Sequence, residues 1–386
     1  MHPTNTLPTP SAEALAHSQA LTDRMRAAIL ANGGSIPFQV YMQMALYEPG
    51  FGYYVAGLRK IGADGDFVTA PEVSPLFSAC LANQCAQILD SLGCGDILEL
   101  GAGSGLMAAD MLLRLEALQC LPERYRILDV SPELRDRQYR TLQAKAPHLL
   151  KRVEWLTALP DQPLRGVVIG NEVLDAMPVE LFTVQGGTLF TVGVGIEGHG
   201  FKLSPLPRLS THKLTSTQTW AEGYTSEFNP ALPGWMQSMA AVLDAGALVL
   251  IDYGYEQDDY YHPERTQGTL LCHYQHRLHD NPLLYPGLQD ITASVDFTAV
   301  AEAGTEAGLE LAGYTTQANF LANSGLEDLF IQALQDKPQQ QYALAQQIRL
   351  LSLPAEMGER FKAIAFTKGF TEPLLGFRLG DRRQRL

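Results

Sequence analysis

The chain has 386 residues, 46% of them hydrophobic, and a net charge of −14 at pH 7. This apolar content suits a packed globular protein rather than a disordered chain, and the acidity argues against a nucleic-acid backbone as the main partner. The five cysteines contain no C-x-x-C pair, so a disulfide framework or zinc knuckle is not expected. With no long apolar run and no secretory leader, we expect a soluble protein of a reducing compartment, the cytoplasm.

The first 95 residues predict a helical N-terminal region that ends in a cofactor-covering loop. Residues 1–10 are rich in Pro and Thr and are expected to be disordered. Apolar residues at helical spacing over 11–32 end at a Gly-Gly pair, which is a strong stop signal. The loop GDFVTAPEVSPLF then precedes a helix over 74–92. Alternatively, this loop is a simple connection, capped before the helix by Thr69 or Ser74.

Short apolar strands alternate with helices after residue 95. The strands are expected at 97–101, 126–130, 153–156, 167–171 and 248–254, and the helices at 104–118, 132–146 and 235–243. This alternation predicts a parallel sheet covered on both faces. Two late strands, at 309–317 and 361–369, predict a terminal antiparallel pair. We therefore expect a doubly wound, Rossmann-like α/β domain.

This domain is expected to cover residues 96–386 and to carry two lid-like insertions, at about 181–235 and 255–295. The first insertion contains LFTVQGGTLFTVGVGI. Its alternating pattern predicts a β-hairpin that turns at Gly186 and Gly187.

The sharpest local signal is ILELGAGSGLMAADML, which places Gly101, Gly103 and Gly105 between a strand and a helix. Glycines let the backbone turn tightly and approach a ligand, and the free N–H groups of a helix start favour an anionic group. Asp129 ends the next strand, where a carboxylate accepts both hydroxyls of an adenosine ribose. The alternative is that the glycines only close the turn between strand and helix.

Two adenosine cofactors fit this pattern, S-adenosylmethionine and NAD. Glu99 would attract an ammonium or sulfonium group but repel a pyrophosphate. The spacing is G-x-G-x-G, whereas the dinucleotide turn prefers G-x-G-x-x-G. The terminal antiparallel pair is also what class I methyltransferases add to a doubly wound sheet. These features favour S-adenosylmethionine and methyl transfer, with an NAD-dependent oxidoreductase as the weaker alternative.

Longer segments carry a more specific likeness. They are EPGFGYY, GDFVTAPEVSPLF, LELGAGSGLMAADML, DVSPELRDRQ, NEVLDAMPVELF, IDYGY, GTLLCHYQH, PGLQDITASVDF and TQANFL, spanning roughly residues 40–320. In these segments the chain resembles the MidA family of methyltransferases, whose mitochondrial members assist respiratory complex I assembly by methylating an arginine. The resemblance implies methyl transfer to a protein side chain, arginine first. This chain has no obvious transit peptide, and a non-catalytic assembly factor that keeps the cofactor fold remains the alternative.

The glycine loop and the resemblance together give a set of candidate cofactor-binding residues. They are Glu99, Gly101, Ala102, Gly103, Gly105, Asp129, Val130, Pro71 and Ser74. The family often has Glu at the position of Asp129, and both acids accept two hydroxyls.

The segment NEVLDAMP follows the fourth strand, at the carboxyl end of the sheet where such folds bind ligands. Glu172 and Asp175 are three residues apart, so one helical turn would place both carboxylates on one side. Two carboxylates hold a guanidinium bidentately while one nitrogen is aimed at the methyl group. We therefore predict Glu172, Asp175 and Asn171 as catalytic residues. The alternative is that the acids only favour a helix dipole.

Three histidines, His273, His276 and His279, recur every third residue beside Cys272. A distant Cys/His pair that would complete a tetrahedral site is missing, so no metal is expected. The basic end, DRRQRL, is expected to be a short solvated tail. The expected partner is a protein substrate, without nucleic acid or membrane insertion, and a homodimer is left open.

Overall fold

The computed structural model describes residues 7–56, 69–210 and 220–386, and the chain divides into two compact units. The first unit comprises the described parts of 1–67, 175–231 and 257–296, and the second those of 68–174, 232–256 and 297–386. Helix α4 (Pro75–Leu92) belongs to the second unit, so the division differs from the boundary expected at residue 95. Of the segment expected to be disordered, residues 1–6 lie outside the described residues.

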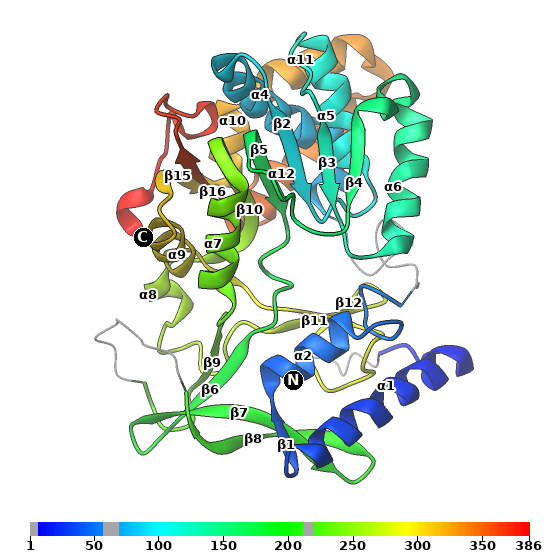
Figure 1. Cartoon of the computed structure of the whole chain (residues 1–386), viewed down its shortest axis with the longest axis vertical. Coiled ribbons are helices and arrows are strands. Elements are labelled where there is room, and N and C mark those ends of the chain that lie inside the picture. The colour runs from blue at the N-terminus through cyan, green and yellow to red at the C-terminus, as the bar shows by residue number, and fades with distance from the viewer. Residues whose placement is uncertain (1–6, 57–68, 211–219) are drawn as a thin grey trace. The chain divides into compact units, whose positions relative to one another are not determined.

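The second unit is built on one sheet with the strand order β15-β16-β10-β5-β2-β3-β4 (Figure 1). Five strands are parallel: β2 (Asp96–Leu100), β3 (Tyr125–Leu128), β4 (Val153–Leu156), β5 (Leu164–Asn171) and β10 (Leu243–Tyr255). The last two, β15 (Glu310–Thr316) and β16 (Phe361–Lys368), are antiparallel, and β16 pairs antiparallel with β10. The doubly wound sheet with its terminal antiparallel pair is therefore confirmed.

Helices cover both faces of this sheet because its strands are apolar on both sides. Alternate residues, among them Ile97, Val167 and Val249, are buried in one core with α4 and α5 (Leu106–Ala117). The residues between them, such as Val168 and Leu250, are buried as well. The unit's remaining helices are α3 (Ala70–Val73), α6 (Pro132–Lys145), α7 (Leu232–Val242), α9 (Phe297–Glu306), α10 (Gln317–Asn323), α11 (Leu326–Asp336), α12 (Gln341–Ser352) and α13 (Met357–Arg360).

The chain order of the strands fixes where a ligand binds. From β2 the chain continues to β3 and β4 on one side, whereas β5 and β10 lie on the other side. The crevice at such a reversal, outside the carboxyl ends of the strands, is where open α/β sheets bind ligands. Here the glycine loop follows β2, and Glu172 follows Asn171, the last residue of the adjacent β5.

The first unit combines helices with two antiparallel sheets. Its helices are α1 (Ala12–Ala31), α2 (Phe38–Tyr47) and α8 (Gln257–Tyr260). One sheet has the order β1-β7-β6-β9, with β8 on β7, and the other β12-β11-β13. These strands are β1 (Ser35–Pro37), β6 (Glu180–Gln185), β7 (Thr188–Glu197), β8 (Gly200–Leu209), β9 (Thr225–Phe228), β11 (Leu271–Tyr274), β12 (Arg277–His279) and β13 (Asp290–Thr292). β6 and β7 pair antiparallel around Gly186 and Gly187, which confirms the predicted hairpin.

The predicted histidines lie in the small sheet of the first unit, His273 on β11 and His279 on β12. The described residues contain no group of three His, Cys, Asp or Glu side chains arranged to hold a metal ion. Within the same residues, each helix is too short or too polar to cross a membrane.

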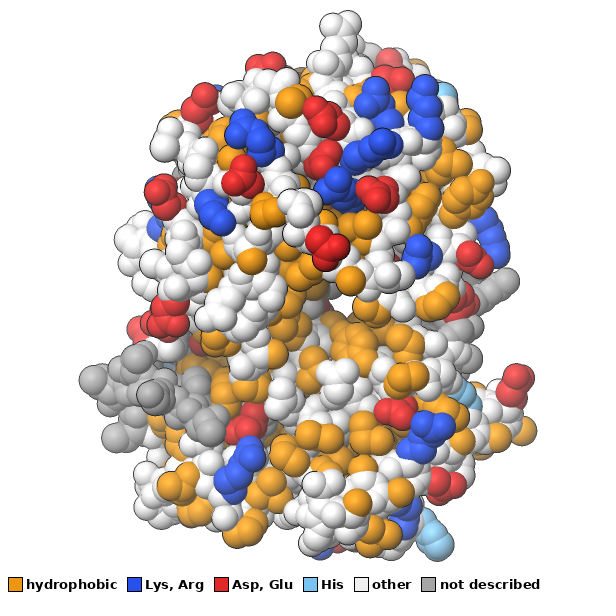
Figure 2. Space-filling view, viewed as in Figure 1, with side chains coloured by type: hydrophobic (Ala, Val, Ile, Leu, Met, Phe, Trp, Pro, Cys, Tyr) orange, Lys and Arg blue, Asp and Glu red, His pale blue; other side chains and the backbone are white. Residues whose placement is uncertain are grey.

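Charged side chains on the second unit are mixed in sign. Figure 2 shows Lys and Arg side chains interspersed with Asp and Glu over this unit. Ion pairs within it join Lys145 to Asp110 at 2.5 Å and Arg126 to Asp96 at 3.2 Å. Such partly exposed pairs contribute little to stability, so we interpret the mixture mainly as a solvated surface.

Residues 383–385 of the basic C-terminal tail are exposed, as expected, but the tail also docks on the edge strand β15. The backbone N–H of Arg382 donates to the Tyr314 carbonyl at 2.6 Å, and Asp381 accepts the Tyr314 N–H at 3.3 Å. The Arg383 guanidinium donates to Asp381 at 2.7 Å and to the Leu311 carbonyl at 2.9 Å. An edge strand presents unpaired backbone groups, and the tail satisfies several of them.

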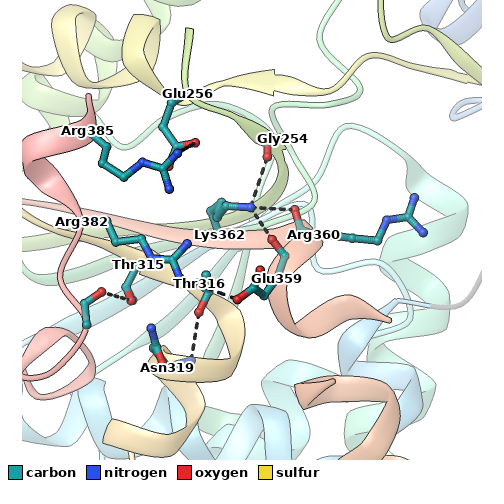
Figure 3. Close-up of polar contacts among 11 residues, drawn as sticks. Gly254, Glu256, Thr315, Thr316, Asn319, Glu359, Arg360, Lys362, Arg382 and Arg385 are labelled. Atoms are coloured by element: carbon teal, nitrogen blue, oxygen red, sulfur yellow. Dashed lines mark hydrogen bonds and ion pairs between the residues drawn. The ribbon is translucent and has the colours of Figure 1, made fainter. Parts of the chain in front are cut away.

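The tail also brings arginines to a buried lysine at the end of the sheet (Figure 3). Lys362 donates from its ammonium group to the carbonyls of Gly254 and Arg360, each at 3.4 Å, and also to that of Glu359. Burial lowers the pKa of Lys362. Arg385 lies 3.6 Å from Glu256, which follows β10. These contacts fix the end of β16 against β10.

We predict that Asp381→Ala destabilises the protein by about 1–2 kcal/mol, because the Tyr314 N–H and the Arg383 guanidinium lose their acceptor. Urea unfolding of the variant measures this loss. The control is Asp161→Ala, which removes an exposed carboxylate from a loop. Equal effects of the two substitutions would show that the docked tail contributes no stability.

Candidate active site

The glycine loop between β2 and α5 has the backbone that only glycine adopts easily. Gly101, Gly103 and Gly105 have φ angles of +62°, +52° and +79°. A Cβ on Gly105 would lie 2.8 Å from the Cα of Gln138, so α6 could not approach this loop if the residue were larger. The loop therefore combines a tight turn with close packing of the neighbouring helix.

Glu99, on β2 before this loop, is completely buried. Its Oε2 accepts the Tyr125 hydroxyl at 2.6 Å, while its Oε1 has no hydrogen-bond partner among the described residues. Burial raises the pKa of Glu99 to about 7, and the Tyr125 hydrogen bond partly opposes this shift. A buried carboxylate oxygen without a partner fits a cationic group of a ligand.

Asp129 follows β3 and is 6% exposed. Its Oδ1 accepts the Ser131 N–H at 2.9 Å and its Oδ2 accepts the Gln138 amide at 2.7 Å. Burial raises the pKa of this carboxyl group, and the two hydrogen bonds lower it in part. Each carboxylate oxygen accepts more than one hydrogen bond, so Asp129 keeps capacity for the two hydroxyls of a ribose.

Gln138 on α6 is a site residue that sequence reasoning missed. Its amide donates to Asp129 and also to the Gly103 carbonyl at 3.3 Å, and its Oε1 accepts the Trp155 indole N–H at 3.1 Å. The side chain is fully buried. It therefore joins the ribose carboxylate to the glycine loop. The resembling segment DVSPELRDRQ ends at this glutamine, which was the one available signal.

Residues 69–74 reach the glycine loop through Glu72, whose carboxylate accepts the Ser104 hydroxyl. Pro71 lies beside Glu72 in α3. The Ser74 hydroxyl caps α4 by accepting the Leu76 N–H at 3.3 Å, and it donates to Gln347 at 2.9 Å. Cofactor binding by Pro71 and Ser74 stays a prediction, as it does for Ala102, which is buried, and Val130, which is exposed.

The turn after β5 differs from the helical turn expected for NEVLDAMP. Glu172 has a φ of +54°, in the left-handed region, and no helix begins here. The N–H groups of Val173 and Leu174 donate to the Asp252 carboxylate on β10 at 3.1 and 2.9 Å. These bonds hold the backbone in a bend, so the helical spacing of the two acids was a wrong expectation.

Of the predicted catalytic residues, Asn171 and Glu172 lie together. The Asn171 amide donates to the Glu172 carboxylate at 3.0 Å. Asp175 belongs to the first unit, is 5% exposed, and accepts the Ala293 N–H on its carbonyl at 3.0 Å. Nearby, the Tyr54 hydroxyl donates to Asp290 at 2.9 Å, and burial, followed by the charges of Asp290 and Asp175 among others, raises the pKa of Tyr54.

A doubly wound sheet with an antiparallel end, a left-handed glycine loop after its first strand and a buried carboxylate after its second strand define a class I methyltransferase. A family model for S-adenosyl-L-methionine-dependent methyltransferases matches residues 80–315. The chain belongs to this family, and with it to the MidA-type methyltransferases that the sequence resembles.

Solved structures agree with this assignment. A crystal structure of a Burkholderia thailandensis protein bound to S-adenosylhomocysteine is 45% identical, with a TM-score of 0.94, and covers 99% of this chain and 100% of its own. A native structure of a protein from the same organism is 44% identical, with a TM-score of 0.91 and the same coverage. The chain is thus an S-adenosylmethionine-dependent methyltransferase.

Relatives that are named as arginine methyltransferases have lower sequence identity to this chain. The Drosophila melanogaster relative, named a mitochondrial protein arginine methyltransferase NDUFAF7 homolog, is 28% identical over 98% of this chain and 93% of its own length. The mitochondrial protein arginine methyltransferase NDUFAF7 of Xenopus tropicalis is 30% identical over 85% of this chain and 81% of its own length.

The residues present fit this cofactor. The Oε1 of Glu99, which has no partner in the described part of the chain, suits its ammonium group. Asp129 suits its ribose, and the glycine loop leaves room for close approach. A pyrophosphate would be repelled by the buried carboxylate of Glu99 when ionised.

We predict that Gln138→Leu weakens S-adenosylhomocysteine binding about tenfold, the effect of losing one good hydrogen bond in the site. The side chain keeps its volume, but Asp129 and Gly103 lose their shared donor. Calorimetry on folded protein measures the affinity. Gln143→Leu, at an exposed position of α6, is the matched control and should bind normally. Normal binding by Gln138→Leu would contradict the role of Gln138.

Glu99 makes stability depend on pH. Its pKa rises from 4.5 to about 7 on folding, so the folded chain holds this proton more tightly. The contribution of protonated Glu99 to folding stability is therefore fully present at low pH, and it is lost as the pH rises from about 4.5 to 7. We predict that the free energy of unfolding of Glu99→Gln increases relative to that of wild type as the pH rises through this window, by at most about 3 kcal/mol. Thermal unfolding at pH 5 and pH 8 measures the gain, and a constant difference between the two proteins would contradict it.

Proposed function

We propose that this methyltransferase modifies an arginine side chain of a protein, with Glu172 holding the guanidinium. Relatives covering most of the chain are named protein arginine methyltransferases. The observation that carries the proposal is the strained backbone of Glu172, at the carboxyl end of the strand beside the glycine loop. Left-handed conformations of non-glycine residues cost free energy and gather at functional sites.

Methyl transfer to a guanidinium requires an anion that orients the group and a base that accepts its proton. When bound, S-adenosylmethionine supplies a methyl group on a positively charged sulfur, which keeps the S–C electron pair. A guanidinium is protonated at neutral pH and has no free lone pair to offer. A carboxylate at one edge localises the charge there and leaves another nitrogen to form the N–C bond. That nitrogen loses one proton, and we assign the Glu172 carboxylate as its acceptor.

Asn171 has an orienting role in this proposal. Its amide donates to one oxygen of Glu172, and this hydrogen bond would fix the orientation of the carboxylate. A catalytic role for Asp175 stays a prediction from the sequence.

An arginine acceptor implies that the partner is a protein. The compartment is proposed from the cysteines: all five are free, which suits a reducing compartment such as the cytoplasm. The named relatives are described as mitochondrial, and that location is stated for those proteins. The absence of a nucleic-acid partner stays a prediction, and a homodimer stays open.

We predict that Glu172→Gln lowers single-turnover methyl transfer about a hundredfold or more, while S-adenosylhomocysteine affinity stays within about twofold. The substitution keeps the shape of the side chain but removes its charge. The assay follows labelled methyl into arginine of protein from a cell extract, identified by mass spectrometry. Asp175→Asn should show a smaller loss of the same kind.

Glu302→Gln, at an exposed position on α9, is the matched control and should transfer at the wild-type rate. Wild-type transfer by Glu172→Gln would remove Glu172 from the mechanism. A wild-type protein that binds S-adenosylhomocysteine but labels no arginine would instead overturn the arginine substrate, and would favour a binding or assembly role.

A further inference from the structure

A buried aspartate on β10 holds the turn that carries Glu172. Asp252 is 1% exposed. Its Oδ2 accepts two consecutive backbone N–H groups, from Val173 at 3.1 Å and from Leu174 at 2.9 Å. Its Oδ1 accepts the Tyr253 N–H at 2.9 Å. Both oxygens of this carboxylate therefore accept backbone N–H groups.

The same strand supplies a third contact to the turn. The Glu172 N–H donates to the Ile251 carbonyl at 2.9 Å. Three successive N–H groups, from residues 172 to 174, are thus fixed by two adjacent residues of β10. Successive N–H groups around a left-handed residue form a concavity that binds anions, and here the anion is the chain's own carboxylate.

Strand register explains why Asp252 can reach this turn. β5 and β10 are parallel neighbours, and Ile251 is aligned with Asn171, the last residue of β5. Asp252 is therefore placed one step beyond the end of β5, beside the departing chain. Charge-assisted hydrogen bonds from a buried carboxylate are strong enough to hold a residue in a conformation that costs free energy by itself.

We infer that Asp252 is a positioning residue that clamps the left-handed backbone of Glu172 and thereby aims its carboxylate. This inference rests on the proposed function for its catalytic meaning, although the clamp itself does not. Asp252 acts through Glu172 and has no direct role in methyl transfer.

The clamp is tested first without any activity assay, by comparing Gly with Ala at position 172. Both substitutions remove the carboxylate, but only Gly tolerates a positive φ. We expect Glu172→Gly to unfold about 2–3 °C above Glu172→Ala in the wild-type background. In an Asp252→Asn background the turn can relax, so this difference should shrink below about 1 °C. Equal midpoints in the wild-type background, or an undiminished difference in Asp252→Asn, would overturn the clamp.

The catalytic meaning is tested by a double-mutant cycle on single-turnover methyl transfer. We expect Asp252→Asn to lower the rate about tenfold or more, with S-adenosylhomocysteine affinity unchanged within about twofold. In the Glu172→Gln background the same substitution should cost less than about twofold, because the residue it positions is already disabled. Asp244→Asn, exposed on the same strand, is the matched control with wild-type rates.

The outcomes separate the two proposals. An Asp252→Asn loss that is as large in the Glu172→Gln background as in wild type would mean that Asp252 does not act through Glu172. Absence of arginine methylation by the wild-type protein would overturn the proposed function, and the Gly-to-Ala comparison would still decide whether Asp252 clamps the turn. The first arm of that comparison needs only the wild-type background, so equal midpoints of Glu172→Gly and Glu172→Ala would overturn the clamp even if Asp252→Asn folds poorly.

Discussion

At two of the loops that leave the carboxyl end of the sheet, a buried carboxylate accepts N–H groups of the chain itself. After β3, Asp129 accepts the N–H of Ser131 and the amide of Gln138. After β5, the turn is held from the neighbouring strand, where Asp252 accepts the N–H groups of Val173 and Leu174. A buried charge is costly without partners, so these carboxylates remain in place only while the local backbone keeps its shape. The geometry of the cofactor site and of the Glu172 turn depends on this mutual constraint.

The same constraint explains how the site tolerates strain. Gly101, Gly103 and Gly105 adopt positive φ angles without penalty, but Glu172 does so against its preference. Glycine would relieve that strain and would also remove the carboxylate. Glutamate at position 172 lowers the folding stability but keeps a carboxylate in a fixed position. Functional sites commonly combine these two effects.

Glu99 is different, because among the described residues only one of its carboxylate oxygens has a hydrogen-bond partner. Its raised pKa places its titration near neutral pH, so the charge of the cofactor site depends on the solution and on the ligand. A cationic ligand group would favour the ionised form and supply the interaction that the protein leaves out. This asymmetry distinguishes a carboxylate available to a ligand from carboxylates that hold the scaffold.

Local features of the sequence determined the sheet and the cofactor loop. Continuous apolar runs specify buried parallel strands, and glycines after the first run specify positive φ angles, so both are encoded within a few residues. Asp129 could be placed because it ends a strand. The sequence carried no comparable signal for Gln138, for Asp252 or for the docking of the tail on β15, although DVSPELRDRQ and IDYGY lay within the family resemblance. Asp252 lies 79 residues from Val173, and a single hydrogen-bonding side chain has no periodicity. Only tertiary structure, by aligning β5 with β10, decided that NEVLDAMP forms a clamped bend rather than a helical turn.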